Sequence, residues 1–323
     1  MRQNLTAKRV AIALVLGLLL VLLAVYIEFY ATPDEPGHVE LIRNGAGQLL
    51  VPVTIDGQEY QFVLDTGSPY VLLRSDDTNA QSAVDAERIE LAFGSGVRTG
   101  TVAEVDLRCG DHSASDFAIM LLDEDGADLD SLLGRDVDGI LGLAEPDYRD
   151  DERLDWIIEA MMPTVSSYSI FPRAFGHSTL QFDPPVLGAD AVAYVESLEQ
   201  DGRTSMEPRV AVRLVDADSG REAVGLALLD SDAETAVTID HDLWEQLSPA
   251  SGDPDANSFP MNVNLFGDDG DTLSVGRWSP EDAHIVDLSH TDYDIVLGLD
   301  VWRALSVRVA LSQDGTVVTT AGR

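Results

Sequence analysis

Short segments in which apolar and polar residues alternate run through most of this chain, and glycine-containing turns separate them. Residues 50–55 and 59–64 flank an Asp-Gly dipeptide at 56–57, which favours a two-residue hairpin turn because glycine readily adopts a positive φ. Residues 210–215 and 222–229 repeat this arrangement around a longer turn. Segments with helical spacing are few, so the pattern predicts a mainly β protein.

An aspartate follows the return arm of each predicted hairpin. The first arm leads into Asp-Thr-Gly-Ser at 65–68, and the second leads into the related sequence Asp-Ser-Asp at 230–232. Each motif is followed much later by two apolar residues and a glycine, at 140–142 in the first half and at 296–298 in the second. Because both parts of the pattern recur, the sequence predicts two duplicated lobes that bring one carboxylate each to a shared centre.

The length of 323 residues suits two lobes of roughly 130 residues, each with its own core. We place the boundary between them at Pro184-Pro185, because two missing backbone donors suit a connection better than the centre of a sheet. The N-terminal lobe then covers residues 48–185, and the C-terminal lobe covers 186–323. Two short helices are expected, over 154–162 and 300–305.

The N-terminal part of the chain has the pattern of a membrane anchor. Basic residues within 1–9 precede an apolar run over 10–27, whose length is near the lower limit for spanning a hydrocarbon core of about 30 Å. We expect a transmembrane segment over 10–30 with residues 1–9 in the cytoplasm, a tether over 31–47, and the rest of the chain outside the cytoplasm. The alternative is a cleaved signal peptide and a secreted protein, although no small-residue cleavage site stands out.

The chain is strongly acidic, with 57 acidic against 20 basic residues and a net charge of -37. This charge argues against nucleic acid as a partner, because phosphates would be repelled. Solubility at high salt, an acidic medium and genome composition are three open explanations for the acidity. Cys109 is the only cysteine, so no intramolecular disulfide can form, and the spacing of cysteine and histidine indicates no metal site. No metal or other cofactor is expected.

Two aspartates held close together cannot both ionise easily, so they share one proton. The ionised carboxylate can take a proton from water while the protonated one hydrogen-bonds to a carbonyl oxygen. Water can then attack a peptide carbonyl without a covalent intermediate or a metal. Thr66 and Ser231 place a hydroxyl next to each aspartate, and Gly67 lets the turn direct its N–H inward.

From about Gly47 to its C-terminus, the chain resembles the pepsin-like (A1-type) aspartic peptidases. Besides the motif at 65–68, residues 137–144 resemble the segment that closes the first lobe in that family, and 166–171 resemble the strand that leads out of it. Residues 295–298 resemble the closure of the second lobe. The resemblance implies a bilobal acid protease fold and a monomeric catalytic domain. Together with the N-terminal anchor, it suggests a prokaryotic membrane-anchored member without an inhibitory prosegment.

The resemblance also assigns roles to individual residues. It implies a catalytic pair, residues that support the pair, and a flap tip that closes over the substrate: Asp65 and Asp230; Thr66, Gly67, Ser68 and Ser231; and Phe93, Gly94 and Ser95. The family usually has tyrosine at position 93, glycine at position 232 and a hydroxyl residue at position 233, where this chain has Phe93, Asp232 and Ala233. Asp232 adds a third carboxylate, which raises the cost of ionising the pair.

These features predict an aspartic endopeptidase whose peptide or protein substrates bind in an extended conformation between the lobes. The alternative is a catalytically degenerate relative on the cell surface that keeps the cleft and binds peptides or a partner protein. Asp232 and Ala233 divide the two hypotheses, because catalysis requires the second loop to keep its turn with Asp230 held beside Asp65.

Overall fold

The computed structural model describes the following residues: 38–75, 88–93, 96–123, 137–144, 153–161, 167–172, 178–182, 191–196, 199–200, 203–204, 208–233, 235–247, 261–266, 272–278, 283–289, 291–305, 307–312 and 315–320. No helix within these residues has both the length and the apolar character needed to cross a membrane. The predicted membrane segment, 10–30, lies outside them.

The described residues lie mainly in β-strands, which confirms the predicted class. In chain order the elements are β1 (His38–Arg43), β2 (Leu49–Ile55), β3 (Gln58–Asp65), β4 (Val71–Arg74), β5 (Arg88–Phe93), β6 (Gly96–Cys109), β7 (His112–Leu122), β8 (Gly139–Gly142), α3 (Ile157–Met161), β9 (Ser167–Phe171), β10 (Ser178–Phe182), β11 (Ala191–Glu196), β12 (Glu199–Gln200), β13 (Arg203–Thr204), β14 (Arg209–Asp216), β15 (Glu222–Leu229), β16 (Val237–Asp240), α4 (His241–Leu247), β17 (Met261–Phe266), β18 (Thr272–Trp278), β19 (Ala283–Val286), β20 (Ile295–Leu297), α5 (Leu299–Leu305), β21 (Val307–Ser312) and β22 (Gly315–Thr320).

Both predicted hairpins are confirmed. In the first, β2 pairs with β3 from Leu50↔Val63 to Ile55↔Gln58, and the two turn residues have positive φ, 50° at Asp56 and 82° at Gly57. Positive φ at both turn positions matches the right-handed twist of the flanking strands. In the second, β14 pairs with β15 across a longer turn, as the sequence predicts.

The two halves of the chain repeat one arrangement of strands. In the first half β3 pairs parallel with β8, β8 pairs antiparallel with β4, and β4 pairs parallel with β7. In the second half β15, β20, β16 and β19 pair in the same order and with the same directions. The duplicated sequence pattern therefore corresponds to a duplicated topology, in which Asp65 and Asp230 stand at equivalent strand ends.

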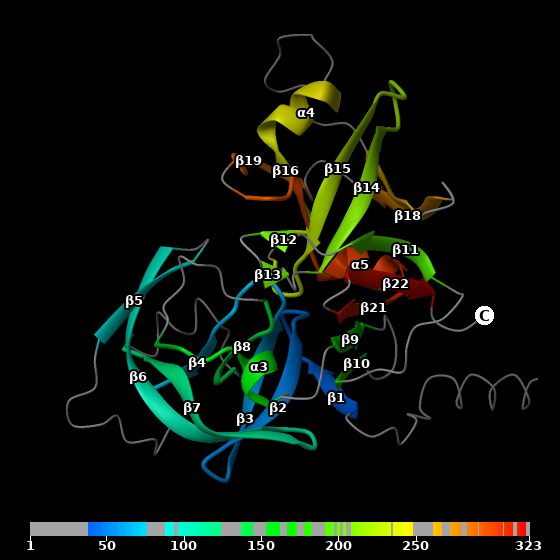
Figure 1. Cartoon of the computed structure of the whole chain (residues 1–323). Coiled ribbons are helices and arrows are strands. Elements are labelled where there is room, and N and C mark those ends of the chain that lie inside the picture. The colour runs from blue at the N-terminus through cyan, green and yellow to red at the C-terminus, as the bar shows by residue number, and fades with distance from the viewer. Residues whose placement is uncertain are drawn as a thin grey trace, which may run out of the picture.

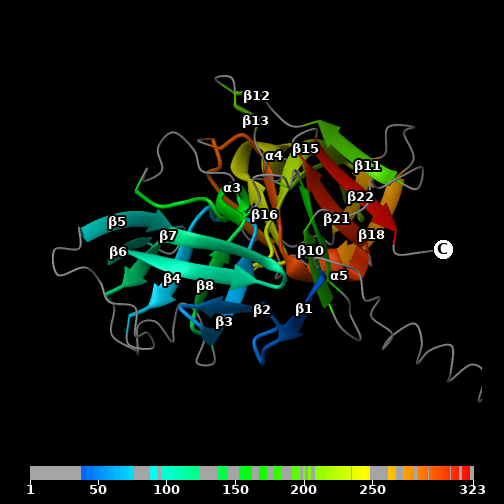
Figure 2. The same ribbon diagram turned by 60° about the horizontal axis from the view of Figure 1, so that its bottom comes forward.

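One large sheet joins strands from distant parts of the sequence. It has 13 strands in the order β11-β22-β21-β9-β10-β1-β2-β3-β8-β4-β7-β6-β5, and a separate sheet has seven strands in the order β18-β17-β14-β15-β20-β16-β19. Strand β21, near the C-terminus, pairs with β9 from the first half. In both Figure 1 and Figure 2, β5 and β6 lie at the opposite side of the molecule from β18.

Of the two predicted helices, one begins later than expected. Helix α3 covers Ile157–Met161, whereas the sequence pattern predicts a helix over 154–162. The backbone N–H of Asp155 donates to Ala118 O at 3.2 Å, and its carboxylate accepts from Ala118 N at 2.8 Å. Because Asp155 is bound to the edge of β7 in this way, the helix begins after it. The second helix, α5, begins at Leu299, one residue before the predicted range.

The range predicted as a tether, 31–47, contains strand β1. This strand pairs with β10 through His38↔Gln181 to Leu41↔Ser178, and with β2 at Ile42↔Leu50 and Arg43↔Leu49. Its alternate residues Val39 and Leu41 are buried, a period that suits a strand. The prolines on which the tether prediction depends precede this strand and, like the predicted boundary at Pro184-Pro185, lie outside the described residues.

The largest hydrophobic cluster reaches the strand ends that carry the two aspartates. Leu64 and Leu141 in the first half, and Leu229 and Leu297 in the second, are all fully buried members of it. Burying a leucine side chain contributes about 1.5–3 kcal/mol relative to leaving it exposed. The residues that directly precede Asp65 and Asp230 are therefore packed into a common core.

Candidate active site

Asp65 and Asp230 are held at equivalent places by neighbouring parallel strands. Asp65 is the last residue of β3, and its carbonyl oxygen accepts a hydrogen bond of 2.8 Å from Leu143 N, just after β8. Asp230 directly follows β15, and its N–H donates to the carbonyl oxygen of Leu297, the last residue of β20, at 3.0 Å. The apolar-apolar-glycine segments therefore fix the backbone of both aspartates.

The residues after the two aspartates join the loops through reciprocal hydrogen bonds. Thr66 N donates to Ser231 Oγ at 3.2 Å, and Ser231 N donates to Thr66 Oγ1 at 3.0 Å. Each hydroxyl also donates to the opposite strand, Thr66 Oγ1 to Leu229 O at 2.7 Å and Ser231 Oγ to Leu64 O at 2.6 Å. Both side chains are buried, so each pairing satisfies groups that would otherwise be left without partners away from water.

Backbone N–H groups orient both aspartate carboxylates. Asp65 Oδ1 accepts from Gly67 N at 2.8 Å and from Ser68 N at 3.1 Å. Asp230 Oδ1 accepts from Asp232 N at 3.0 Å. The inward N–H predicted for Gly67 is therefore present, and Ser68 adds a second donor. Backbone donors in a tight turn hold a carboxylate more rigidly than side chains do, because the strands on either side fix the turn.

The first loop approaches the carboxylate of the second very closely at Gly67. A Cβ atom added to Gly67 would lie 3.1 Å from Asp230 Cγ and 3.1 Å from Asp230 Oδ2. These separations are shorter than ordinary contacts, so a larger residue would displace the Asp230 carboxyl group. Glycine at this position therefore permits the approach of the two loops.

The electrostatic environment raises the pKa of both carboxyl groups. Burial, the negative charge of Asp230 and that of Asp232 hold the pKa of Asp65 well above its usual range, against the opposing effect of its backbone donors. Burial also raises the pKa of Asp230, and the N–H groups of Asp232 and Ala233 partly offset that increase. Since the charge of one group disfavours ionisation of the other, the two carboxyl groups titrate as a pair that retains one proton above the usual aspartate range.

The unusual residue of the second loop, Asp232, leaves the turn intact. Its N–H donates to Asp230 as a glycine N–H would, and the non-glycine residues with positive φ in the described part of the chain are Asp56 and Asp116, both elsewhere. Ala233 also supplies a backbone donor to Asp230. The replacement of glycine by aspartate at this position therefore adds a carboxylate without straining the backbone.

The added carboxylate has a partner from the other half of the chain. Gln48 Nε2, at the start of the first hairpin, donates to Asp232 Oδ1 at 2.8 Å. Gln48 closes a turn whose other end is Asn44, and Asn44 Nδ2 donates to Gln48 Oε1 at 2.7 Å. Asn44 Oδ1 accepts from Ala46 N and Gln48 N, both at 3.0 Å. Sequence reasoning does not identify these residues, because nothing in the local pattern pairs Gln48 with a residue 184 positions away.

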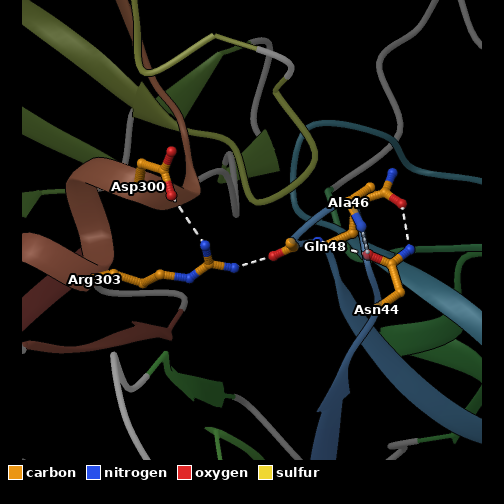
Figure 3. Close-up of polar contacts among 6 residues, drawn as sticks. Asn44, Ala46, Gln48, Asp300 and Arg303 are labelled. Carbon is orange, nitrogen blue, oxygen red and sulfur yellow. Dashed lines mark hydrogen bonds and ion pairs between the residues drawn. The ribbon is translucent and has the colours of Figure 1, made fainter.

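Helix α5 supports the same turn. Figure 3 shows the Arg303 side chain extending towards the turn formed by Asn44 and Gln48. The Arg303 guanidinium donates to the carbonyl oxygen of Gly47 and to Asp300 Oδ1, the latter at 2.9 Å. Because α5 follows β20 directly, this contact is a further link between the second half of the chain and the beginning of the first.

The predicted flap is described only in its stem. Strands β5 and β6 pair from Arg88↔Thr101 to Phe93↔Gly96. Phe93 ends β5, while Gly94 and Ser95 lie outside the described residues.

Comparison with known proteins finds similarity to aspartic proteases in part of the sequence and in the fold. Residues 51–143 match the family model described as aspartyl protease. No curated protein has a detectably similar sequence. Among solved structures, the aspartic proteinase from Irpex lacteus is similar, with a TM-score of 0.64 and 14% sequence identity over 88% of this chain and 97% of that one. At such low identity the likeness concerns the fold. The chain therefore has an aspartic proteinase fold, and its first half carries an aspartyl protease sequence signature.

Proposed function

We propose that this chain is an aspartic-type endopeptidase in which Asp65 and Asp230 form the catalytic pair. The proposal rests on the arrangement of the two loops, which Thr66 and Ser231 join by reciprocal hydrogen bonds and in which Gly67 lies directly against the Asp230 carboxyl group. The raised pKa of Asp65, caused by burial and by the charges of Asp230 and Asp232, is consistent with this arrangement. A pair that retains one proton provides an acid and a base in the same site.

In the proposed reaction, the ionised carboxylate of the pair accepts a proton from a water molecule, and the water oxygen attacks the peptide carbonyl carbon. The protonated carboxyl group hydrogen-bonds to the carbonyl oxygen, on which negative charge develops. Collapse of the tetrahedral intermediate breaks the carbon–nitrogen bond, and the amine leaves with a proton from the pair. The backbone donors of Gly67, Ser68 and Asp232 keep both carboxyl groups oriented during these steps.

We further propose that the chain is a bilobal, pepsin-like (A1-type) enzyme that acts as a monomer. The repeated topology and the likeness to the Irpex lacteus aspartic proteinase along most of both chains support this assignment. Each half supplies one aspartate, so a second copy of the chain is not needed to complete the pair. An extended peptide or protein segment is the proposed substrate, with the hairpin of β5 and β6 covering it.

The proposed location is the cell membrane, with the catalytic domain outside the cytoplasm. The proposed source of the protein is a prokaryote. The apolar run over 10–27 behind a basic N-terminus supports an anchor, and the near absence of lysine supports the origin. Secretion after cleavage of the N-terminal segment is the alternative. The mass of the protein recovered from intact cells distinguishes an uncleaved anchor from a cleaved signal peptide.

The test of the proposed activity is cleavage of an unfolded protein by the full chain from pH 3 to 8, at low and high salt. Asp65→Asn and Asp230→Asn are assayed beside it, and each is expected to lower the rate about a thousandfold, because either substitution removes acid–base catalysis. A surface variant, Asp242→Asn in α4, is the matched control. Folded protein without activity under every condition would instead support a peptide- or protein-binding role.

A further inference from the structure

Asp232 places a third negative charge close to the two aspartates of the proposed catalytic pair. Its carboxylate stands in a loop whose counterpart in the first half has Gly67, and its charge contributes to raising the pKa of Asp65. If this third carboxylate could rotate freely, it could also bind the proton shared by Asp65 and Asp230. The electric field that it exerts on those two groups would then vary as it rotates. The contacts around Asp232 therefore bear on the proposed reaction.

The amide of Gln48 is oriented by its surroundings. Its Oε1 accepts from Asn44 Nδ2, and its Nε2 donates to Asp232 Oδ1. Reversing the amide would place two donors against each other at Asn44 and two acceptors against each other at Asp232, so only one orientation satisfies both partners. Asn44 is fixed in turn by the two backbone donors that its Oδ1 accepts, from Ala46 and Gln48.

The turn that carries Gln48 is fixed from the second half of the chain. Arg303 of α5 donates to Gly47 O, next to Gln48, and is itself paired with Asp300. Strand β1 before the turn and strand β2 after it are paired at Ile42↔Leu50 and Arg43↔Leu49. Gln48 thus approaches Asp232 from a turn that is held by contacts with both halves of the chain.

We infer that Gln48 is a positioning residue that fixes the Asp232 carboxylate beside the proposed catalytic pair, an inference that rests on the proposed function. The Gln48 amide favours the ionised form of Asp232 and holds its carboxylate in one orientation. The electric field that Asp232 exerts on Asp65 and Asp230 therefore stays constant. The described charged groups near this contact include Asp65 and Asp230 in the loops. Behind the turn they include Arg303, Asp300 and Arg43, whose charge acts on Arg303. Gln48 acts through Asp232 and is not itself a catalytic residue.

A double-mutant cycle tests the contact without any need for activity. The midpoint of thermal unfolding at pH 7 is measured for the full chain, Gln48→Ala, Asp232→Ala and the double variant. Gln48→Ala is expected to lower the midpoint by about 3 °C when Asp232 is present, and by about 1 °C in the Asp232→Ala background, where only the bond from Asn44 is lost. Asp232→Gly replaces Asp232→Ala if the latter does not fold, and Gln246→Ala, on the exposed surface of α4, is the matched control. Additive midpoints would overturn the inference.

Steady-state kinetics test the effect on the pair. Gln48→Ala is expected to lower kcat about tenfold with little change in KM, because one hydrogen bond to a charged group is lost while the substrate contacts remain. In Gln48→Glu, which has nearly the same shape, a second negative charge faces Asp232. That charge raises the pKa of the pair further, so the alkaline limb of the pH–rate profile moves to higher pH. In the Asp232→Ala background, Gln48→Ala should leave kcat nearly unchanged, because the residue through which Gln48 acts is already absent. A Gln48 that only stabilised the turn would lower kcat equally with and without Asp232.

The two tests separate failure of this inference from failure of the proposed function. If the full chain has no peptidase activity under any condition but the unfolding midpoints are non-additive, the proposed function fails and the positioning of Asp232 by Gln48 stands. If the full chain is active while the midpoints are additive and Gln48→Ala lowers kcat equally with and without Asp232, the proposed function stands and the inference fails.

Discussion

The loops that carry Asp65 and Asp230 have the same backbone design and differ at the position two residues after the aspartate. In the first loop this position is Gly67, and in the second it is Asp232, yet the N–H at both places donates to the aspartate two residues earlier. The orientation of each aspartate therefore depends on the backbone N–H donor at this position and on the space around the residue that carries it. Room is short at Gly67, where an added Cβ would press on the Asp230 carboxyl, whereas the side chain of Asp232 is accommodated and bound by Gln48.

This comparison shows how a duplicated fold can become asymmetric without losing its site. The cross-braces are reciprocal, because Thr66 and Ser231 each donate to the other loop and to the opposite strand. The electrostatic environment of the two aspartates is not symmetric, because Asp65 experiences the negative charges of both Asp230 and Asp232. The two loops should therefore differ in how well they tolerate substitution.

The largest difference in kcat between the two loops is expected from substitutions at the equivalent positions 67 and 232. Gly67→Ala should lower kcat about a hundredfold, because its Cβ displaces the Asp230 carboxyl from its position in the pair. Asp232→Gly should cost much less, since the backbone donor to Asp230 is kept. Steady-state kinetics of the two variants, together with their circular dichroism spectra as a check on folding, measure this difference. Equal losses in both would show that the loops tolerate side chains alike.

The cross-brace should contribute equally from both sides. Thr66→Val and Ser231→Ala each leave buried backbone and hydroxyl groups without partners, at a cost of about 2 kcal/mol per substitution in the free energy of unfolding. The double variant should lose less than the sum, because both substitutions break the same reciprocal bonds. Denaturant unfolding monitored by fluorescence tests this expectation. Strict additivity would mean that the loops are held together independently of this contact.

The smallest effect is expected from removing the charge of Asp232 while keeping its shape. Asp232→Asn removes an anion that raises the pKa of Asp65, so the pKa of the pair falls and its shared proton leaves at lower pH. The alkaline limb of the pH–rate profile should therefore move towards acid pH, and the effect should weaken with salt because salt screens charges. The pH dependence of kcat/KM at low and high ionic strength measures the shift. A limb that moves to higher pH would contradict the account.

Much of the fold follows from local patterns in the sequence. The hairpins at 50–64 and 210–229 are predictable, because the alternation of apolar and polar residues and the Asp-Gly turn of the first hairpin are properties of adjacent residues. The recurrence of an aspartate followed much later by an apolar-apolar-glycine segment predicts a duplicated arrangement, which the structure forms by pairing β3 with β8 and β15 with β20. The start of α3 is not predictable in this way, because it depends on hydrogen bonds between Asp155 and Ala118 in a distant strand.

The candidate site shows the same division. Asp65, Asp230, Thr66 and Ser231 can be found from the sequence, because each belongs to a repeated motif. Gln48 cannot, since its role depends on one hydrogen bond across 184 positions and on a turn that Arg303 holds from α5. Strand β1 is a similar case, because its segment is short and gains its pairing from β10.

A proton shared between Asp65 and Asp230 can be tested directly by titrating the Asp65 carboxyl group with carbon-13 NMR, in the full chain and in Asp230→Asn. The pKa of Asp65 is expected to lie well above the usual aspartate range in the wild-type chain, and to fall when Asp230 becomes an uncharged asparagine. An Asp65 that titrates like an exposed carboxyl group, or one that is unaffected by Asp230→Asn, would contradict a shared proton between the two loops.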